Sequence, residues 1–321
     1  ETGGDPVYLN FAGNDIVGVD IGKADIRVAE FMYLSGSFAF RMGEIYDVNV
    51  DLGGLGPFAQ TLGVTLGTNL NPLPMQVKAM TIGGSNLTGF VGVGGPYRFG
   101  DDGPDQDLLP DNINENAVGM VIDDVDFGLA IMSPTLFNIV PGLESIAPKF
   151  ISAKADVGTA GLVGIDPDLL TVVAKDIEVN INTFYWSILG PAGNAALQAF
   201  GPPSIDYTTS PSFAGYTEDA NGNGLLDLGE DLNHNGRLDS GEDTNSDGIL
   251  QESEDLNHNG LIDTAGFALP TGGNNAVFLD FDEEIIQAKV GYAEINLAGF
   301  VQLSASMAFT KKGSEEVTLS N

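Results

Sequence analysis

Alternating apolar and polar positions dominate this chain and predict β-strands. The clearest stretch is residues 24–40, ADIRVAEFMYLSGSFAF, where apolar side chains recur mostly at every second position. A period of two is typical of a strand with one buried face, and few stretches keep the 3.6-residue period of an amphipathic helix. We therefore expect a mostly β fold, with long antiparallel strands in a sandwich-like or elongated β repeat domain. A short helix is expected near residues 192–200, after Gly190 and Pro191.

A second stretch, residues 293–309, repeats the first without a gap. Its sequence, AEINLAGFVQLSASMAF, shares with residues 24–40 the pattern A-[DE]-I-x-[VL]-A-x-F-[MV]-x-L-S-[GA]-S-[FM]-A-F. A match of this length indicates duplication. Residues 7–40 and 277–309 are therefore predicted to adopt the same strand arrangement, the first opening one unit and the second opening the next.

The alternation also predicts which side chains of the second copy are buried. A slip of one residue would turn the whole apolar face to solvent, so register is strongly constrained in a half-buried strand. We expect four side chains to pack on the preceding unit: Ile295, Leu297, Val301 and Leu303. Residues 154–157 (KADV) also match residues 23–26 (KADI), although more weakly. This match has two explanations: the unit is itself doubled, with a boundary near residue 150, or similar strands have converged on similar sequences.

An acidic run at residues 219–263 repeats a twelve-residue unit four times. Side-chain oxygens recur at positions 1, 3 and 5 of each unit, and glycine follows at position 6. This is the D-x-[DN]-x-[DN]-G pattern of a calcium loop, in which alternate residues turn oxygens inward and glycine permits the bend around the ion. A glutamate at position 12 completes the first three loops, whereas the fourth has Gly266 there and is incomplete or borrows a ligand.

The pattern predicts three or four bound Ca²⁺ ions, held by positions 1, 3, 5, 9 and 12 and by the backbone carbonyl of position 7. The predicted ligands of the first two loops are Asp219, Asn221, Asn223, Leu225, Asp227 and Glu230, then Asp231, Asn233, Asn235, Arg237, Asp239 and Glu242. Those of the last two loops are Asp243, Asn245, Asp247, Ile249 and Glu254, then Asp255, Asn257, Asn259, Leu261 and Asp263.

The alternative for this run is a solvated acidic linker, which is what a charged stretch usually is. Three complete loops that match at the same positions favour calcium. Each loop ends where the next begins, so the flanking helices of an EF-hand have no room. The run resembles the thrombospondin type 3 and related bacterial calcium repeats, in which an otherwise irregular chain wraps successive ions. The resemblance covers these residues alone, and Gln251 at position 9 departs from the commonest pattern.

Charge and composition restrict the partners. The 321 residues carry 12 Lys and Arg against 45 Asp and Glu, for a formal net charge of −33. Such an excess repels a phosphate backbone, so we expect no nucleic acid partner. The chain has no cysteine, which removes disulfides, thiol nucleophiles and cysteine zinc sites. No apolar segment approaches the roughly 18 residues of a membrane span, and no signal peptide is recognised.

Candidate catalytic groups are few. Both histidines, His234 and His258, occupy position 4 of a calcium loop, which points away from the ion, so a Ser-His-Asp triad and a histidine metal hydrolase are not expected. Carboxylates gather at residues 123–126 and 280–284 and have the spacing that glycoside hydrolysis uses. Sugar sites usually add stacking aromatics, and the chain has one tryptophan, Trp186, so we favour exposed strand faces or strand-end calcium ligands.

Long alternating strands, a tandem unit and serial calcium loops together resemble the repeat regions of very large bacterial surface or secreted adhesin-like proteins. The resemblance implies a non-catalytic, calcium-stabilised structural repeat of an extracellular or cell-surface rod, in which calcium fixes a joint or spur that self-repulsion would otherwise disorder. Its expected partners are neighbouring repeats of the same chain and cell-surface or matrix ligands. The alternative is a calcium-dependent carbohydrate-binding or carbohydrate-active module.

Four segments follow from these patterns. Residues 1–6 are expected to be a linker or a remnant of expression, and residues 7–217 a β repeat unit. Residues 218–266 hold the tandem calcium loops, as an irregular calcium-wrapped insertion. Residues 267–321 are expected to end the unit and supply the first strands of the next repeat.

Overall fold

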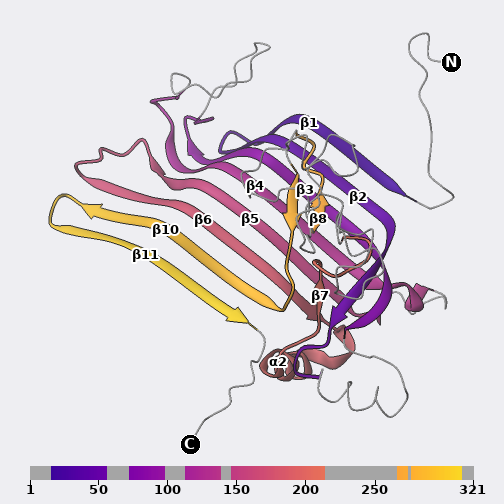
Figure 1. Ribbon diagram of the computed structural model, residues 1–321. Coiled ribbons are helices and arrows are strands. Elements are labelled where there is room, and N and C mark those ends of the chain that lie inside the picture. Colours follow the sequence, from indigo (N-terminus) through magenta and orange to yellow (C-terminus); the bar gives the residue numbers. More distant parts are fainter. Residues whose placement is uncertain are drawn as a thin grey trace, which may run out of the picture.

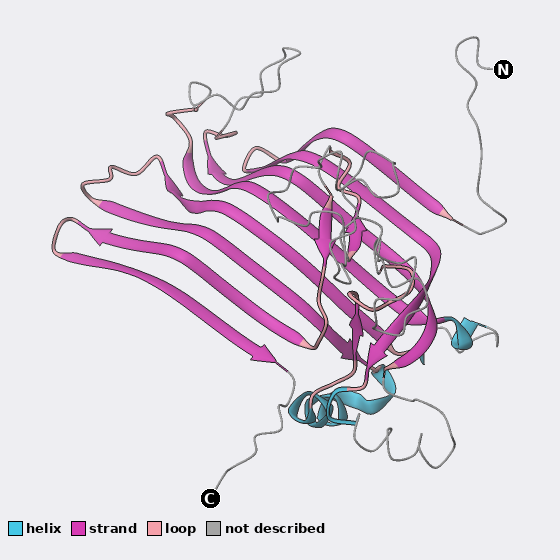
Figure 2. Ribbon diagram, in the orientation of Figure 1, coloured by secondary structure: helices cyan, strands magenta, loops and turns pink. Residues whose placement is uncertain are grey.

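The structure is a computed structural model of the chain, and it describes residues 16–55, 72–97, 113–138, 146–213, 266–273 and 276–312. Eight long strands form one antiparallel sheet in which strands follow one another in chain order (Figure 1). Strands make up most of the described residues, as Figure 2 shows, which confirms the mostly β fold with long antiparallel strands.

The long strands, in spatial order, are β1 (Val17–Val28), β2 (Met32–Asp51), β3 (Leu73–Val93), β4 (Val118–Pro134), β5 (Lys149–Val163), β6 (Leu170–Tyr185), β10 (Ile285–Leu297) and β11 (Val301–Lys312). The short strand β7 (Ser204–Asp206) pairs with the end of β2, and β8 (Phe267–Leu269) pairs with β9 (Val277–Leu279) in a separate two-stranded sheet.

Helix is scarce, as the sequence predicts. The one described α-helix is α2 (Gly190–Phe200), which includes the predicted segment and carries a proline in its first turn, where the missing N–H costs no hydrogen bond. Short 3-10 helices are η1 (Gly53–Leu55), η3 (Thr135–Asn138) and η5 (Ser187–Leu189). In the described part of the chain, no helix has the length and apolar character needed to cross a membrane.

The core lies on one face of the sheet, under β7, β8 and β9. Two glycines of the long strands let the covering segment approach the sheet closely. A Cβ atom at Gly128 would lie 2.6 Å from the Leu269 side chain, and one at Gly83 would lie 2.2 Å from the Pro270 carbonyl oxygen. The core is formed by Val48, Val50, Val77, Ala79, Ala130, Met132, Phe150, Phe184, Ile205, Tyr207, Phe213, Phe267, Leu269, Leu279 and Phe281.

The predicted duplication is present at the two edges of the sheet. The β1–β2 hairpin forms one edge and the β10–β11 hairpin forms the other (Figure 1). Ile26 pairs with Leu34 in the first hairpin, and the equivalent Ile295 pairs with Leu303 in the second.

Two irregularities are also shared. Each hairpin turn begins with an alanine in the left-handed region, at φ 52° for Ala29 and 47° for Ala298. The register shifts between Ile21 and Ala24 in the first hairpin, and between the equivalent residues, Val290 and Ala293, in the second. The described parts of the two copies therefore have the same strand arrangement, as predicted.

The predicted burial of the second copy is wrong. Ile295, Leu297, Val301 and Leu303 are 44%, 47%, 52% and 59% exposed. The hairpin extends the sheet sideways from β6 at its far edge, so β6 covers its backbone, whereas β7, β8 and β9 cover the sheet elsewhere. Gln302 is exposed as well, so the hairpin tip is open on both faces among the described residues.

Candidate functional site

The predicted calcium ligands, from Asp219 to Asp263, all lie outside the described residues, as do His234 and His258. Of the fourth loop, only Gly266 at position 12 is described. Within the described ranges, no group of three or more His, Asp or Glu side chains is placed to hold a metal ion. The described residues on either side of the acid-rich segment are Phe213 and Gly266.

The two ends of residues 214–265 meet at one point. The backbone N–H of Gly266 donates a hydrogen bond to the carbonyl oxygen of Phe213, at 2.7 Å. The rings of Phe213 and Phe267 stack with centroids 4.5 Å apart. A segment whose ends touch is an excursion from one domain, not a connection between two.

Five aromatic side chains hold this point, and we call them the aromatic anchor: Tyr46, Tyr207, Phe213, Phe267 and Phe281. Tyr46 comes from β2 and lies 5.0 Å from Phe213 and 4.9 Å from Phe267 between ring centroids. Tyr207 is fully buried, 5.3 Å from Phe213. Burial raises the pKa of both tyrosines, and the hydrogen bond from the Tyr46 hydroxyl to Glu44 adds to the rise for Tyr46. Both anchor tyrosines are therefore neutral at physiological pH.

A tight turn leads the chain from β7 into the anchor. The Asp206 carboxylate accepts hydrogen bonds from the backbone N–H groups of Thr208 and Thr209, at 2.9 and 3.1 Å. This is the local side-chain turn that aspartate favours. The hydroxyls of Ser210 and Ser212 then accept hydrogen bonds from backbone N–H groups of β2 at 2.9 and 2.8 Å. The start of the acid-rich segment is thus fixed to the sheet before Phe213.

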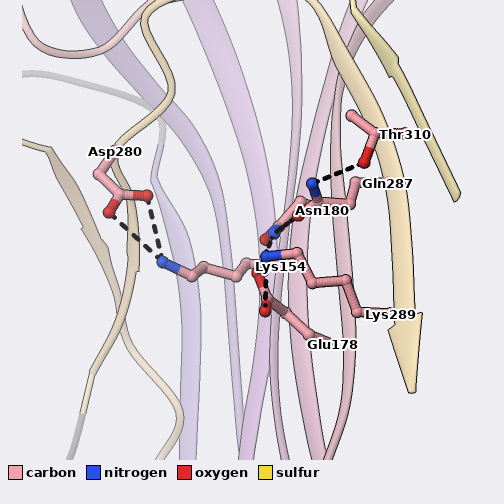
Figure 3. Close-up of polar contacts among 7 residues, drawn as sticks. All are labelled: Lys154, Glu178, Asn180, Asp280, Gln287, Lys289 and Thr310. Atoms are coloured by element: carbon pink, nitrogen blue, oxygen red, sulfur yellow. Dashed lines mark hydrogen bonds and ion pairs between the residues drawn. The ribbon is translucent and has the colours of Figure 1, made fainter. Parts of the chain in front are cut away.

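A polar pocket of about 260 Å³ lies beside the anchor, between β5, β6, β10 and the residues that follow β9. In Figure 3 the Lys154 side chain reaches from the sheet to Asp280, with Nζ 3.1 Å from Oδ1. Lys289 Nζ lies 3.0 Å from Oε2 of Glu178. The pocket is lined by Lys154, Glu178, Asn180, Asp280, Phe281, Asp282, Glu283, Ile285 and Lys312.

Three of the four acids that line the pocket are paired with lysines. Burial opposes ionisation of Glu178, but hydrogen bonds from Lys289 and Asn180 outweigh it and lower the pKa of this carboxyl. On β5, burial raises the pKa of Asp156, with the neighbouring Glu178 and Asp126 adding to the rise and Lys154 opposing it. Paired charges of this kind hold strands and loops in place.

Carboxylates at residues 123–126 and 280–284 are held by local hydrogen bonds and ion pairs. Asp123 accepts a hydrogen bond from the Thr88 hydroxyl at 2.7 Å, and Asp126 accepts one from the backbone N–H of Asn86 at 2.8 Å. The acids of residues 280–284 are engaged by lysines instead: Asp280 by Lys154, Glu283 by Lys312 and Glu284 by Lys311.

These lysines were missed by sequence reasoning. The available signal was their scarcity, because in a chain with 12 cations and 45 acids a Lys or Arg has many possible acidic partners. Glu284 is 2% exposed, so Lys311 at 2.6 Å compensates a buried carboxylate and closes the open end of the β10–β11 hairpin.

Comparison of the chain with protein-family models, with curated proteins and with solved structures finds no match. Its function is therefore inferred from its own residues and geometry.

Proposed function

We propose that the chain is a calcium-stabilised structural repeat of an extracellular, adhesin-like or cell-surface rod protein, and that it is non-catalytic. The observation that carries this proposal is the repetition of one hairpin at both edges of the sheet. If β10 and β11 open the next unit, that unit's first hairpin completes the sheet of the unit before it. Neighbouring units then share a continuous sheet, which resists bending more than a flexible linker does.

In this proposal calcium stabilises the acid-rich segment. The predicted loops of residues 219–263 concentrate like charges that would repel one another in an empty segment. Ions that bind the folded loops and not the unfolded ones stabilise the folded form by mass action. Because the aromatic anchor holds both ends of the segment, the bound loops form a stiff spur on the side of the rod. Such a spur is suited to present a surface to cell-surface or matrix ligands.

The alternative function, a carbohydrate-binding or carbohydrate-active module, has the polar pocket as its best site. One aromatic ring lines that pocket, that of Phe281, and it is 8% exposed. Sugar rings stack on exposed aromatic faces, so this lining favours the structural role.

A glycan array probed with the full chain, with and without calcium, separates the two functions. We expect no specific binding in either condition, because a spacer has no sugar site. Calcium-dependent binding that Lys154→Ala abolishes, and that Lys23→Ala on the distant edge leaves unchanged, would instead establish the carbohydrate module.

A further inference from the structure

At two places in the sheet, an aspartate with a left-handed backbone lies opposite a glycine of the neighbouring strand. Asp124 of β4 and Asp176 of β6 both have left-handed backbones, at φ 56° and 52°. Each faces a glycine on the following strand, Gly158 on β5 and Gly291 on β10. A Cβ atom at Gly158 would lie 2.9 Å from the Asp124 Cβ, and one at Gly291 would lie 2.8 Å from the Asp176 Cβ. Each left-handed aspartate therefore requires a glycine opposite it.

Gly22 of β1 is the counterpart of Gly291 in the duplicated hairpin. Gly291 faces Asp176, whereas no described strand places an aspartate opposite Gly22. A Cβ atom at Gly22 would meet one atom, the Gly272 carbonyl oxygen, at the ordinary contact distance of 3.8 Å. No positive φ requires glycine at this position either. Gly22 lies in the register shift between Ile21 and Ala24, and among the described residues no close contact also requires a glycine there, unlike at Gly291. A left-handed aspartate on a strand outside β1 would explain it.

The outer edge of β1 has the features of an interface. In the described sheet it is an end of the strand order, with no strand beyond it. Val17, Val19 and Ile21 are between 41% and 50% exposed. A long edge strand with apolar side chains is a template for pairing, and natural proteins usually cover or interrupt it.

We propose that the outer edge of β1 receives a strand of the β6 type from a preceding unit of the tandem array. This proposal rests on the structural-repeat function and names the partner that it requires. Since β10 is the counterpart of β1, the pairing of β10 with β6 gives the register. Gly22 faces the counterpart of Asp176, Ile26 that of Val172 and Val28 that of Leu170.

The charges on β1 indicate that the incoming strand is not identical to β6. In the β6–β10 pair, Glu178 faces Lys289 and Lys175 faces Tyr292. The counterparts on β1 are Asp20 and Lys23. Arg41 already binds the Asp20 carboxylate. The uncompensated contact with an exact copy of β6 would therefore be Lys175 against Lys23, and like charges directly opposite each other are destabilising.

The incoming strand therefore belongs to a related unit of different sequence. We expect it to keep an aspartate at the position of Asp176. It carries an acid or a neutral residue in place of Lys175. A second copy of this chain fits less well, both because of these charges and because its own β6 edge is already paired with β10.

A hairpin exchange within the full chain tests the proposal. Residues 285–310 are replaced by a copy of residues 16–41, which leaves Lys311 and Lys312 in place to pair with their glutamates. In a second variant, the inserted copy carries Lys23→Tyr, the residue of β10, and keeps the Asp20–Arg41 ion pair. The matched control inserts residues 17–42, displaced by one position, which turns every side chain to the opposite face.

The readouts are hydrogen exchange of the β6 amides at residues 170–182 and the thermal midpoint. We expect the charge-corrected variant to retain the β6 protection of the native chain. The uncorrected variant should have a folding equilibrium constant a few-fold lower than that of the corrected one, because Lys23 faces Lys175. The displaced control should exchange on the order of tenfold faster or more, because its hairpin cannot dock.

Equal loss of β6 protection in the corrected and displaced variants would overturn the proposal, because β1 would then be unable to take the place of β10. A corrected variant no more stable than the uncorrected one would overturn the assignment of a charge-altered partner. Neither readout involves calcium or a glycan, so this test can fail while the structural-repeat function stands, and the glycan array can fail while this proposal stands.

Discussion

We expect trypsin to cleave the chain after Arg237 about 100-fold faster when calcium is removed than when calcium is bound. Arg237 is the only Lys or Arg in residues 214–265, so a single cut reports on the whole acid-rich segment. At a free calcium concentration about 100 times the Kd, each ion that binds only the folded loop lowers its open fraction about 100-fold. Cleavage follows that open fraction when opening and closing are fast. The measurement is the cleavage rate, by mass spectrometry, in calcium and in chelator.

Two controls accompany this experiment. Arg237→Gln removes the cut and should leave calcium binding unchanged, because position 7 of a loop uses its backbone carbonyl. Lys154 and Lys289, which lie in the sheet, should be cut at the same slow rate in both conditions. Cleavage after Arg237 at one rate with and without calcium would show that the run is an acidic linker and not a calcium array.

Phe267→Ala should lower the free energy of unfolding by about 3–5 kcal/mol, the usual cost of removing a buried aromatic side chain. Phe267 is 7% exposed and its ring contacts those of Tyr46, Tyr207 and Phe213, so truncation empties the centre of the aromatic anchor. Denaturant unfolding of the calcium-loaded chain measures the change.

The matched control for this prediction is Phe278→Ala on the neighbouring strand β9. Phe278 is 37% exposed, so its loss should cost about 1 kcal/mol or less. If both variants lose the same stability, the anchor does not hold the base of the acid-rich segment as described.

The strands and the duplication were predictable because both depend on local pattern. An alternation with a period of two persists whatever lies beside the strand, and the match of residues 24–40 with 293–309 preserves side-chain order and face. The turns inside these stretches were not predictable in the same way. The alternation is interrupted at residues 29–31, where Glu30 falls on the apolar face, but an alanine with a left-handed backbone is not a turn signal that sequence offers.

Burial and pairing across the sheet depend on tertiary placement, which is why they were missed. Whether Leu303 is covered depends on where β7, β8 and β9 lie, not on its own strand. The contact between Lys154 and Asp280 joins residues far apart in sequence, and its register follows from the packing of β9 over β4 and β5. The aromatic anchor had a partial signal in Phe213 and Phe267, which flank the acidic run on either side.

Calorimetric titration of the full chain with calcium tests the central claim most directly. The account predicts at least three ions per chain in saturable sites. It also predicts that Glu230→Gln, Glu242→Gln and Glu254→Gln, made one at a time, each weaken or remove one of them, because each takes away the bidentate ligand of one loop. Saturation below three ions, or three variants that all titrate as the native chain does, would contradict it.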